Sequence, residues 1–331
     1  MKRFSSYVDK KTYETNEKIT KLQNKTKELF FDCLSRGENV EYFRKELDKI
    51  WGKIDYSFMK KDIEEYEDLI HTYNLEMANY TEEERTEKKQ ISASYIVALG
   101  LIIYQVDKYK NIISKQYDTS INSPGYNMDR TEYIKKKIAQ YNSQTVPYYY
   151  KNGDIRWVKL SSYTAMIENT NLTRSAWNTT LNDADLLGAD KFYIPFHLFS
   201  CEYCRQYQNK ILTREEVNEY LGIDGEQEGD ILHPNCKCSL LIYWGNKINN
   251  YNTFTEEQNN EYYHIRQKIN ALTLKKSELL TDRRIYRKQK DAEDKVDETN
   301  KKIRSINSKI KKLQAELPTE EMKKMVVAIN R

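Results

Sequence analysis

The sequence predicts a mainly α-helical protein in which long helical arms at both ends flank a small α+β module. Only 10 Gly and 5 Pro occur in 331 residues, so few positions are suited to break a helix. Charged residues make up 31% of the chain and hydrophobic residues 39%, a balance that favours long solvated helices over one thick core. Most turn-forming residues and four of the five cysteines cluster in the middle of the chain. We therefore expect three domains: a helical region 1–118, an α+β module 119–250 and a helical region 251–331.

Residues 1–118 are expected to form four helices. Their expected ranges are Lys10–Leu34, Val40–Ile54, Tyr66–Glu87 and Ile91–Ile113, with the first helix ending near Gly37. In the second helix the apolar residues are spaced three or four apart, which places them on one face. These apolar residues are Val40, Phe43, Leu47, Ile50, Trp51 and Ile54.

The uncharged stretch Ile91–Val106 can be interpreted as a membrane span or as a core helix. A span needs about 20 apolar residues, and this stretch is shorter and contains Ser92, Ser94 and Gln105. We therefore expect a buried core helix and no stable membrane insertion. The N-terminus is polar, so no secretory signal is expected.

The segment 119–250 combines turn signals, short strand patterns and one long helix. We expect, in order, a turn at Asn122–Gly125, a β-hairpin of Tyr148–Tyr150 and Ile155–Val158, a helix from Ser161 or Ser162 to about Leu187, and strands at Lys191–Phe196 and Leu240–Trp244. Asn152-Gly153 suits a type I′ turn in the hairpin, and Gly188 suits the left-handed position that ends a helix. The long helix is expected to bury Tyr163, Met166, Ile167, Thr170 and Trp177.

Residues 251–331 are expected to form a helical hairpin or a coiled coil. One heptad seam contains Ile303, Ile306, Ile310, Leu313 and Leu317, and a looser one contains Ile265, Ile269, Leu272, Leu279 and Tyr286. The charged stretch Arg287–Lys295 separates the seams, and Pro318 stops the second helix. Residues 255–331 hold 19 Lys and Arg against 13 Asp and Glu, so this arm is basic, whereas the net charge of +4 for the whole chain requires no nucleic-acid partner.

Four cysteines and two histidines form a pattern of metal ligands between residues 197 and 238. Cys201-Glu-Tyr-Cys204 is a C-x-x-C turn, and His233-Pro-Asn-Cys236-Lys-Cys238 follows it along the chain. Zinc takes four thiolate or imidazole ligands, and two ligand pairs from separated turns close such a site. We therefore expect a structural zinc ion bound by Cys201, Cys204, Cys236 and Cys238, or by this set with His233 replacing one sulfur. His197 is a reserve ligand or a hydrogen-bond partner of a ligand.

Other interpretations of these cysteines stay open. They could form two disulfides, although disulfides are rare in a reducing cytosol. The C-x-x-C could be a redox pair, but no βαβ pattern of the thioredoxin type surrounds it. The thiols could also simply be buried without a metal. Cys33, which lies among Phe30, Phe31 and Leu34, is expected to be a core thiol.

A catalytic zinc site would keep one position open to water, usually beside a carboxylate. The acids near the cysteines are Glu202, Asp224, Glu226, Glu228 and Asp230. The last four lie in a glycine-rich stretch that is typical of a solvated loop. No phosphate-binding loop, serine elbow or paired-carboxylate motif occurs elsewhere, so we expect no enzyme.

The run from Trp157 to Trp244 resembles the phage minor capsid family of the Mu F-like head morphogenesis type. The resemblance rests on the order and spacing of Leu160, Tyr163, Met166, Thr170 and Arg174, then Gly188-Ala-Asp190 and the strand to Phe196, then His197, Cys201 and Cys204, then Tyr207–Ile211, and finally His233-Pro-Asn-Cys236 with Cys238 and Leu240. It covers roughly a quarter of the chain. Asn209 stands where the family usually has Gly, which puts the shape of that turn in question. Lys237 replaces the usual Arg, which is a conservative change unless that Arg forms a bidentate contact, since Lys cannot form one.

This resemblance implies a low-copy virion protein at the portal vertex, assembled in the host cytoplasm and acting in head morphogenesis or DNA ejection. The implied partners are the portal and the major capsid protein, in an oligomeric assembly. The basic C-terminal arm could lie along packaged DNA, since phosphate neutralisation needs no base readout, or it could be a solvated coiled-coil face. A zinc-dependent enzyme or a nucleic-acid-binding zinc module used during entry is the alternative function.

Overall fold

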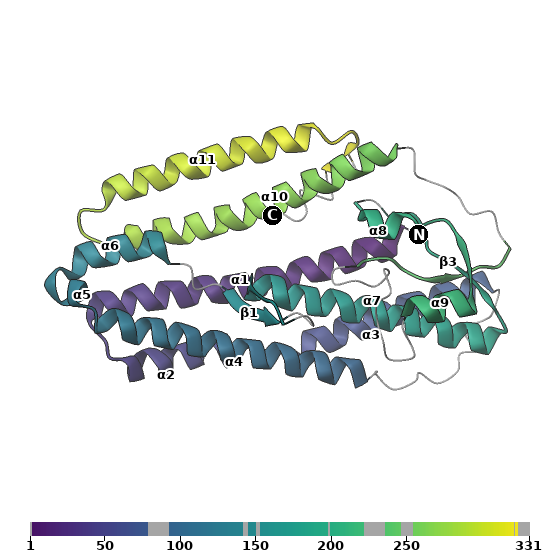
Figure 1. The fold of residues 1–331 in the computed structure, drawn as a ribbon, viewed down its shortest axis with the longest axis horizontal. Coiled ribbons are helices and arrows are strands. Elements are labelled where there is room, and N and C mark those ends of the chain that lie inside the picture. Colours follow the sequence, from purple (N-terminus) through teal and green to yellow (C-terminus); the bar gives the residue numbers. More distant parts are fainter. Residues whose placement is uncertain are drawn as a thin grey trace. The chain divides into compact units, whose positions relative to one another are not determined.

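The computed structural model describes residues 2–78, 93–141, 145–149, 153–197, 199–221, 236–245, 254–320 and 322–323 (Figure 1). The chain divides into two compact units. Unit 1 comprises Met1–Thr15, Asp55–Leu101 and Thr164–His264, and unit 2 comprises Asn16–Ile54, Ile102–Tyr163 and Ile265–Arg331. In the described residues each unit is mainly helical and has one small sheet, which confirms the predicted fold class. The division into the three domains 1–118, 119–250 and 251–331 stays a prediction.

Unit 1 is built from helices that enclose a three-stranded antiparallel sheet. Its helices are α3 (Ser57–Met77), α8 (Glu202–Arg205), α9 (Arg214–Leu221) and parts of α1 (Lys2–Arg36), α4 (Ala93–Ile121), α7 (Leu160–Leu187) and α10 (Glu256–Tyr286). The central strand β3 (Lys191–Tyr193) pairs with β4 (Ile211–Thr213) and β5 (Leu241–Ile242). The predicted strands Lys191–Phe196 and Leu240–Trp244 correspond to β3 and β5 and were too long, and β4 was not predicted from the sequence.

The sheet of unit 1 is buried on both faces, because successive strand residues point to opposite sides. Phe192 and Ile242 belong to a core that contains Trp177 of α7 and three cysteines. Tyr193 and Leu241 belong to a second core with residues of α1 and α3. The cysteines therefore belong to the core that packs one face of the sheet against Trp177 of α7.

Helix α7 ends where the sequence predicts and begins at Leu160, before both predicted caps. Gly188 has a φ of +67°, and the N–H of Ala189 donates to the carbonyl of Ala184 at 2.9 Å, which closes the helix. Neither Ser161 nor Ser162 caps α7, since the helix begins at Leu160. Tyr163 and Trp177 are buried as expected, whereas Met166, Ile167 and Thr170 are only half-buried.

Unit 2 has an aromatic core. Its further elements are α2 (Val40–Trp51), α5 (Pro124–Met128), α6 (Arg130–Gln140), β1 (Thr145–Tyr149), β2 (Ile155–Lys159) and α11 (Glu293–Ala315). The rings of Phe43 and Tyr117 stack at 4.2 Å, and Phe30 packs edge-on against both. The predicted stripe of α2 is confirmed at Phe43, Leu47 and Trp51, which are its buried residues.

Two turn predictions in unit 2 need correction. Pro124 does not sit in an isolated turn but begins α5, where its fixed φ suits the first helical position, and Gly125 does not need a positive φ. The hairpin of β1 and β2 is confirmed, but Tyr149 pairs with Ile155, so the connection is five residues long and not a two-residue type I′ turn. Residues 150–152 of this connection lie outside the described residues.

The prediction that Ile91–Val106 is buried was wrong for one face of the helix. Ala98, Ile102 and Val106 are buried at helical spacing, but Ile96 is 72% and Val97 63% exposed. Apolar residues cover the full circumference of this segment, but the fold packs against one side of it only. Among the described residues, no helix combines the length and apolar character needed to cross a bilayer. The predicted helix Tyr66–Glu87 begins earlier, at Ser57, and the part of that prediction beyond residue 78 lies outside the described residues.

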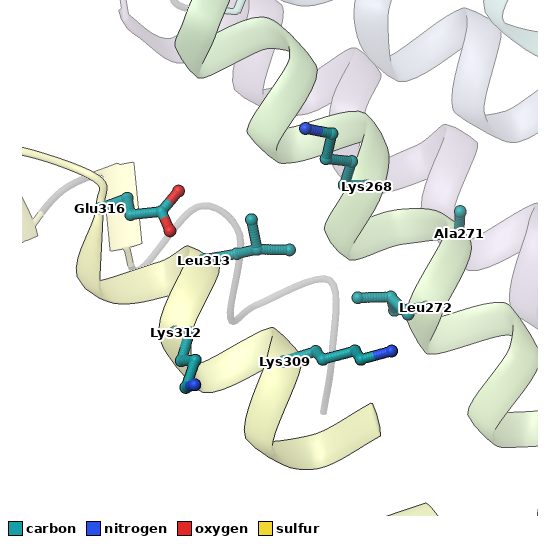
Figure 2. A pocket seen from close by; sticks show the side chains of 7 residues that line it. All are labelled: Lys268, Ala271, Leu272, Lys309, Lys312, Leu313 and Glu316. Atoms are coloured by element: carbon teal, nitrogen blue, oxygen red, sulfur yellow. The ribbon is translucent and has the colours of Figure 1, made fainter. Parts of the chain in front are cut away.

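The predicted C-terminal hairpin is confirmed: α10 and α11 are joined by a turn within the charged stretch (Figure 1). Ile303, Ile306 and Ile310 are buried, and Leu317 is buried just after α11. Leu272, Leu279 and Leu313 are only half-buried. Leu272 and Leu313 line a shallow groove of about 510 Å³ between the two helices, together with Lys268, Ala271, Lys309, Lys312 and Glu316 (Figure 2).

Candidate metal centre

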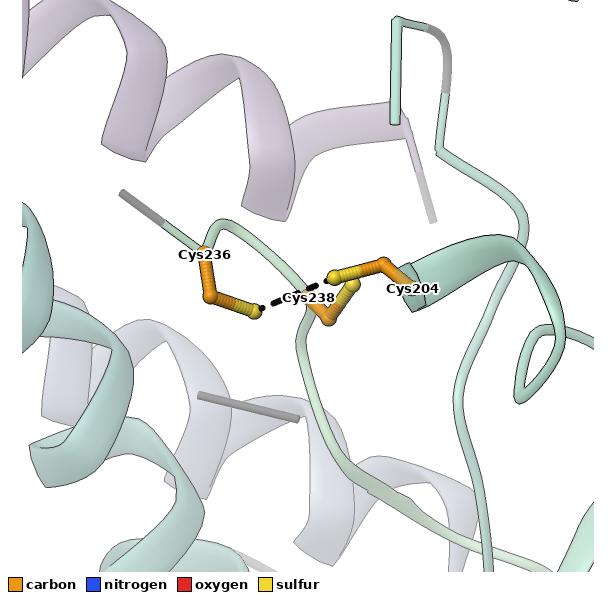
Figure 3. A group of neighbouring side chains, drawn as sticks. All are labelled: Cys204, Cys236 and Cys238. Atoms are coloured by element: carbon orange, nitrogen blue, oxygen red, sulfur yellow. Dashed lines mark hydrogen bonds between the residues drawn. The ribbon is translucent and has the colours of Figure 1, made fainter. Parts of the chain in front are cut away.

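Three cysteine sulfurs meet in the core of unit 1 (Figure 3). Cys204 lies in α8, and Cys236 and Cys238 lie on the segment that leads into β5. Their Sγ atoms are all within 4.8 Å of one another, and those of Cys204 and Cys236 are 3.6 Å apart. Tetrahedral zinc with Zn–S bonds of about 2.3 Å places its sulfurs about 3.8 Å apart. The spacing therefore fits a shared metal ion, and none of the five cysteines, all of them in the described residues, forms a disulfide.

The other predicted ligands differ in how close they come to this group. Cys201 is half-buried, packs against the same core and forms a hydrogen bond with Cys204. His197 is buried, and its main-chain N–H donates to the side chain of Gln208 at 3.4 Å, but its ring is not part of the group of mutually close ligand atoms. His233 lies outside the described residues. The structure thus brings together Cys204, Cys236 and Cys238, with Cys201 in contact at the edge.

The crowded thiols shift one another's pKa values. The pKa of Cys204 is raised, first by the hydrogen bond with Cys201, then by those with Cys236 and Cys238 and by burial. The hydrogen bond with Cys204 lowers the pKa of Cys238, but the one with Cys236 and burial outweigh it, so this pKa is raised as well. Buried thiolates repel one another unless a cation offsets their charge. A divalent ion is the species that would stabilise all of them in the ionised, metal-binding form.

Hydrogen bonds to main-chain carbonyls position the turn that carries Cys201 and Cys204. Cys201 is extended just before α8, and the N–H of Arg205 donates to its carbonyl at 3.1 Å. The guanidinium of Arg205 donates to the carbonyl of Ser200 at 2.6 Å. Phe199 is buried with a φ of 61°, a conformation that is rare for a bulky residue. The chain therefore enters the C-x-x-C turn through a strained residue that its packing holds in place.

The turn after α8 contains a left-handed residue, Asn209, at the position where the sequence resemblance leads us to expect a glycine. Asn209 has a φ of 60°, and its N–H donates to the carbonyl of Ile194 at 2.7 Å. Asn tolerates this conformation better than other residues with a side chain. Asn at this position is thus compatible with the left-handed turn seen here.

Two substitutions of Asn209 should distinguish the effect of backbone strain on stability from the effect of losing the side chain. We expect Asn209→Ala to lower the free energy of unfolding by about 1 kcal/mol, because Ala is strained at positive φ, and Asn209→Gly to leave it unchanged or raise it. Chemical denaturation of both variants measures this. Asn182→Ala, at an exposed helical position of α7, is the control and should change little. An Asn209→Ala variant as stable as the wild type would contradict the assignment.

The burial of Trp177 was predicted from the sequence, but none of the hydrogen bonds that hold the second cysteine segment was identified from it. Four side chains of α7 donate to its carbonyls: Asn169, Thr173, Trp177 and Thr180. Lys237 forms an ion pair with Asp9 of α1. The signal in the sequence was the 4-4-3 spacing of donor side chains along a helix, which is informative only once the opposite segment is known.

The remaining cysteine and the acidic residues considered in the sequence analysis lie apart from the sulfur group or outside the described residues. Cys33 is fully buried in α1, and burial raises the pKa of its thiol to about 11, which confirms a core thiol. Glu202 is exposed on α8 and is not in the sulfur group. The acids between residues 224 and 230 lie outside the described residues. The group of three sulfurs contains no carboxylate.

Comparison with known proteins gives one match. The family model described as phage minor capsid protein 2 matches residues 77–319, which is more than half of the chain and includes the whole cysteine module. No curated protein and no solved structure matches. The resemblance to phage minor capsid proteins inferred from the cysteine module is confirmed. The chain belongs to the phage minor capsid protein 2 family.

Proposed function

We propose that this minor capsid protein is a structural, non-enzymatic component of the portal vertex, acting in head morphogenesis or DNA ejection. The family match over residues 77–319 carries the proposal. The surface is consistent with it: Ile96 and Val97 of α4 are exposed, and the groove between α10 and α11 has an apolar floor. Apolar surfaces of this kind are typical of proteins that assemble with partners.

We further propose that the module binds one structural zinc ion through Cys201, Cys204, Cys236 and Cys238. The ion would supply the positive charge that the crowded thiols lack and would cross-link the α8 turn to the segment before β5. Four thiolates leave no open position for water, which favours a structural role over catalysis. The alternative set has His233 in place of one sulfur, with His197 as the reserve ligand.

The α10–α11 hairpin is proposed as a partner-binding arm. Lys268, Lys309 and Lys312 flank the groove, while Leu272 and Leu313 form its floor (Figure 2). Binding of DNA phosphates would need only the lysines. The apolar floor has no role in such binding, but it suits an acidic amphipathic segment of a protein. Contact with the portal or the major capsid protein is therefore favoured over packaged DNA at this groove.

The proposal is tested in the phage that encodes the chain. An amber mutation in this gene should abolish infectious particles, and a wild-type copy should restore them. Electron microscopy separates the two roles: DNA-free heads indicate morphogenesis, and DNA-filled particles that do not infect indicate ejection. In purified wild-type virions, cross-linking should join the hairpin to the portal or the major capsid protein.

Three outcomes would contradict this proposal. A normal titre of phage that lack the gene product, together with absence of the protein from wild-type virions, would exclude a role in the particle. A metal-dependent hydrolytic activity that is lost in Cys204→Ser while the fold is kept would favour the zinc-enzyme alternative. Cross-links only to DNA, with steep salt dependence, would favour a nucleic-acid-binding module.

A further inference from the structure

A stripe of four buried side chains on α7 contacts the main chain of the second cysteine segment. Asn169 Nδ2 and Thr173 Oγ1 donate to the carbonyl of Cys236 at 2.6 and 3.0 Å. Trp177 Nε1 donates to the carbonyl of Cys238 at 2.7 Å, and Thr180 Oγ1 to that of Leu240 at 2.9 Å. All four donors are no more than 2% exposed. We refer to these four residues as the α7 ladder.

The spacing of the donors along α7 is close to the spacing of alternate carbonyls along an extended chain. Four residues of helix rise about 6 Å, and two residues of extended chain rise about 6.6 Å. Donors about one turn apart on α7 can therefore reach every second carbonyl of a segment that runs along the helix, as Thr173, Trp177 and Thr180 do. Asn169 adds a second donor to the first of these carbonyls, that of Cys236. The segment Cys236–Leu240 contains no turn or helix, and it continues directly into β5.

The other side chains of the segment are held as well. Lys237 forms an ion pair with Asp9 of α1, and the hydroxyls of Ser239 and Tyr66 of α3 lie 3.0 Å apart. Cys236 and Cys238 alternate with these two residues and direct their sulfurs to Cys204 (Figure 3). A shift of one residue would exchange the two sets, because side chains alternate with a period of two. It would replace the sulfurs in the metal group by an ammonium and a hydroxyl.

We propose that the α7 ladder sets the register of Cys236–Leu240 and so assembles half of the metal site before the metal binds. The inference rests on the proposed zinc site and adds the residues that determine its affinity. The carbonyl acceptors belong to the ligand residues themselves, so the ladder acts directly on the positions of the two sulfurs. Asn169, Thr173 and Trp177 are in this sense positioning residues for the metal.

The test measures metal affinity in the full-length protein by competition with a chromophoric chelator for zinc. Thr173→Val removes one donor and keeps the side-chain shape, and we expect the Kd for zinc to rise about tenfold, as is usual for residues that orient metal ligands. Thr173→Ser keeps the hydroxyl and should bind zinc with the Kd of the wild type. Trp177→Phe removes the donor to Cys238 and provides an independent variant.

The matched control is Thr170→Val on the same helix. The Thr170 hydroxyl donates to the carbonyl of Met166 within α7, at 2.9 Å, so its loss should leave the Kd for zinc unchanged whatever it does to stability. The absorption spectrum of the cobalt-loaded protein should report distorted thiolate coordination in Thr173→Val and Trp177→Phe and a wild-type site in Thr170→Val.

The outcomes distinguish this inference from the zinc site itself. A wild-type protein that binds neither zinc nor cobalt would overturn both. A wild-type protein that binds zinc, with Thr173→Val and Trp177→Phe equal to Thr170→Val in Kd and spectrum, would overturn the ladder alone. If Thr173→Val fails to fold, the comparison of Trp177→Phe with Thr170→Val decides.

Discussion

Cys204→Ser is expected to abolish metal binding, with zinc falling from about one ion per chain towards none. Cys204 is the sulfur that joins the two halves of the site, because it lies beside Cys236 and Cys238 and forms a hydrogen bond with Cys201. A serine hydroxyl at this position does not ionise at neutral pH and is a poor zinc ligand. Elemental analysis of the purified variant measures the result. Cys33→Ala is the control, since this thiol is buried in α1 of unit 2 and should not affect zinc content.

The same substitution should also lower stability in the presence of zinc. A ligand that binds only the folded state stabilises it by about 4 kcal/mol when its free concentration is a thousandfold above Kd. That contribution should be absent from Cys204→Ser, so the melting temperatures of wild type and variant should converge when both are measured in a strong chelator. A full zinc complement in Cys204→Ser would show that the metal is bound elsewhere.

Two further variants identify the fourth ligand. Loss of zinc in Cys201→Ser with full zinc in His233→Ala would assign the four-cysteine set. The reverse result would assign the set in which His233 replaces Cys201. The contact between Cys201 and Cys204 is the structural reason for expecting the first result.

Local signals in the sequence were sufficient for the helices and for the two cysteine turns. Gly37 and Gly188 both have positive φ and end the helices that they were expected to end. The C-x-x-C and the Cys236-Lys-Cys238 pair were expected to converge because zinc chemistry requires it, and three of their sulfurs do meet. In each case the decisive information lies within a few residues of the chain.

Information that depends on distant segments could not be predicted. The apolar stretch in α4 has apolar residues on all sides, and only the packing of the fold decides that Ile96 and Val97 face outward. Asn169 and Thr173 look like ordinary helical polar residues until Cys236 is placed opposite them. The register of that pairing spans more than sixty residues of sequence, as the separations of 67 and 63 show.

Asp282→Ala is expected to lower the free energy of unfolding of the protein by about 1–3 kcal/mol, because it leaves the buried ammonium of Lys27 without its acceptor, while removal of the carboxylate's own desolvation cost offsets part of the loss. In unit 2, Asp282 of α10 forms an ion pair with Lys27 of α1, whose side chain is only 4% exposed. The ammonium also lies over the ring of Tyr141 at 5.1 Å, which offsets part of the charge but does not replace a carboxylate. Denaturant unfolding followed by circular dichroism measures the loss. Asp297→Ala on the exposed face of α11 is the control and should change stability by less than about 0.5 kcal/mol.

Two additional measurements distinguish a pair effect from a simple loss of packing. The double variant Lys27→Met/Asp282→Leu should recover most of the stability, since replacing both buried charges is often neutral or favourable. Burial raises the pKa of Asp282 above its ordinary value of 3.8, and this outweighs the lowering by Lys27. The folded state therefore binds this proton more tightly than the unfolded state does, so the stability of the wild type relative to Asp282→Asn should rise as the pH falls through the raised pKa and stop rising below about 3.8. A difference between these two proteins that shrinks on acidification would mean that Lys27, and not burial, dominates the environment of this carboxyl.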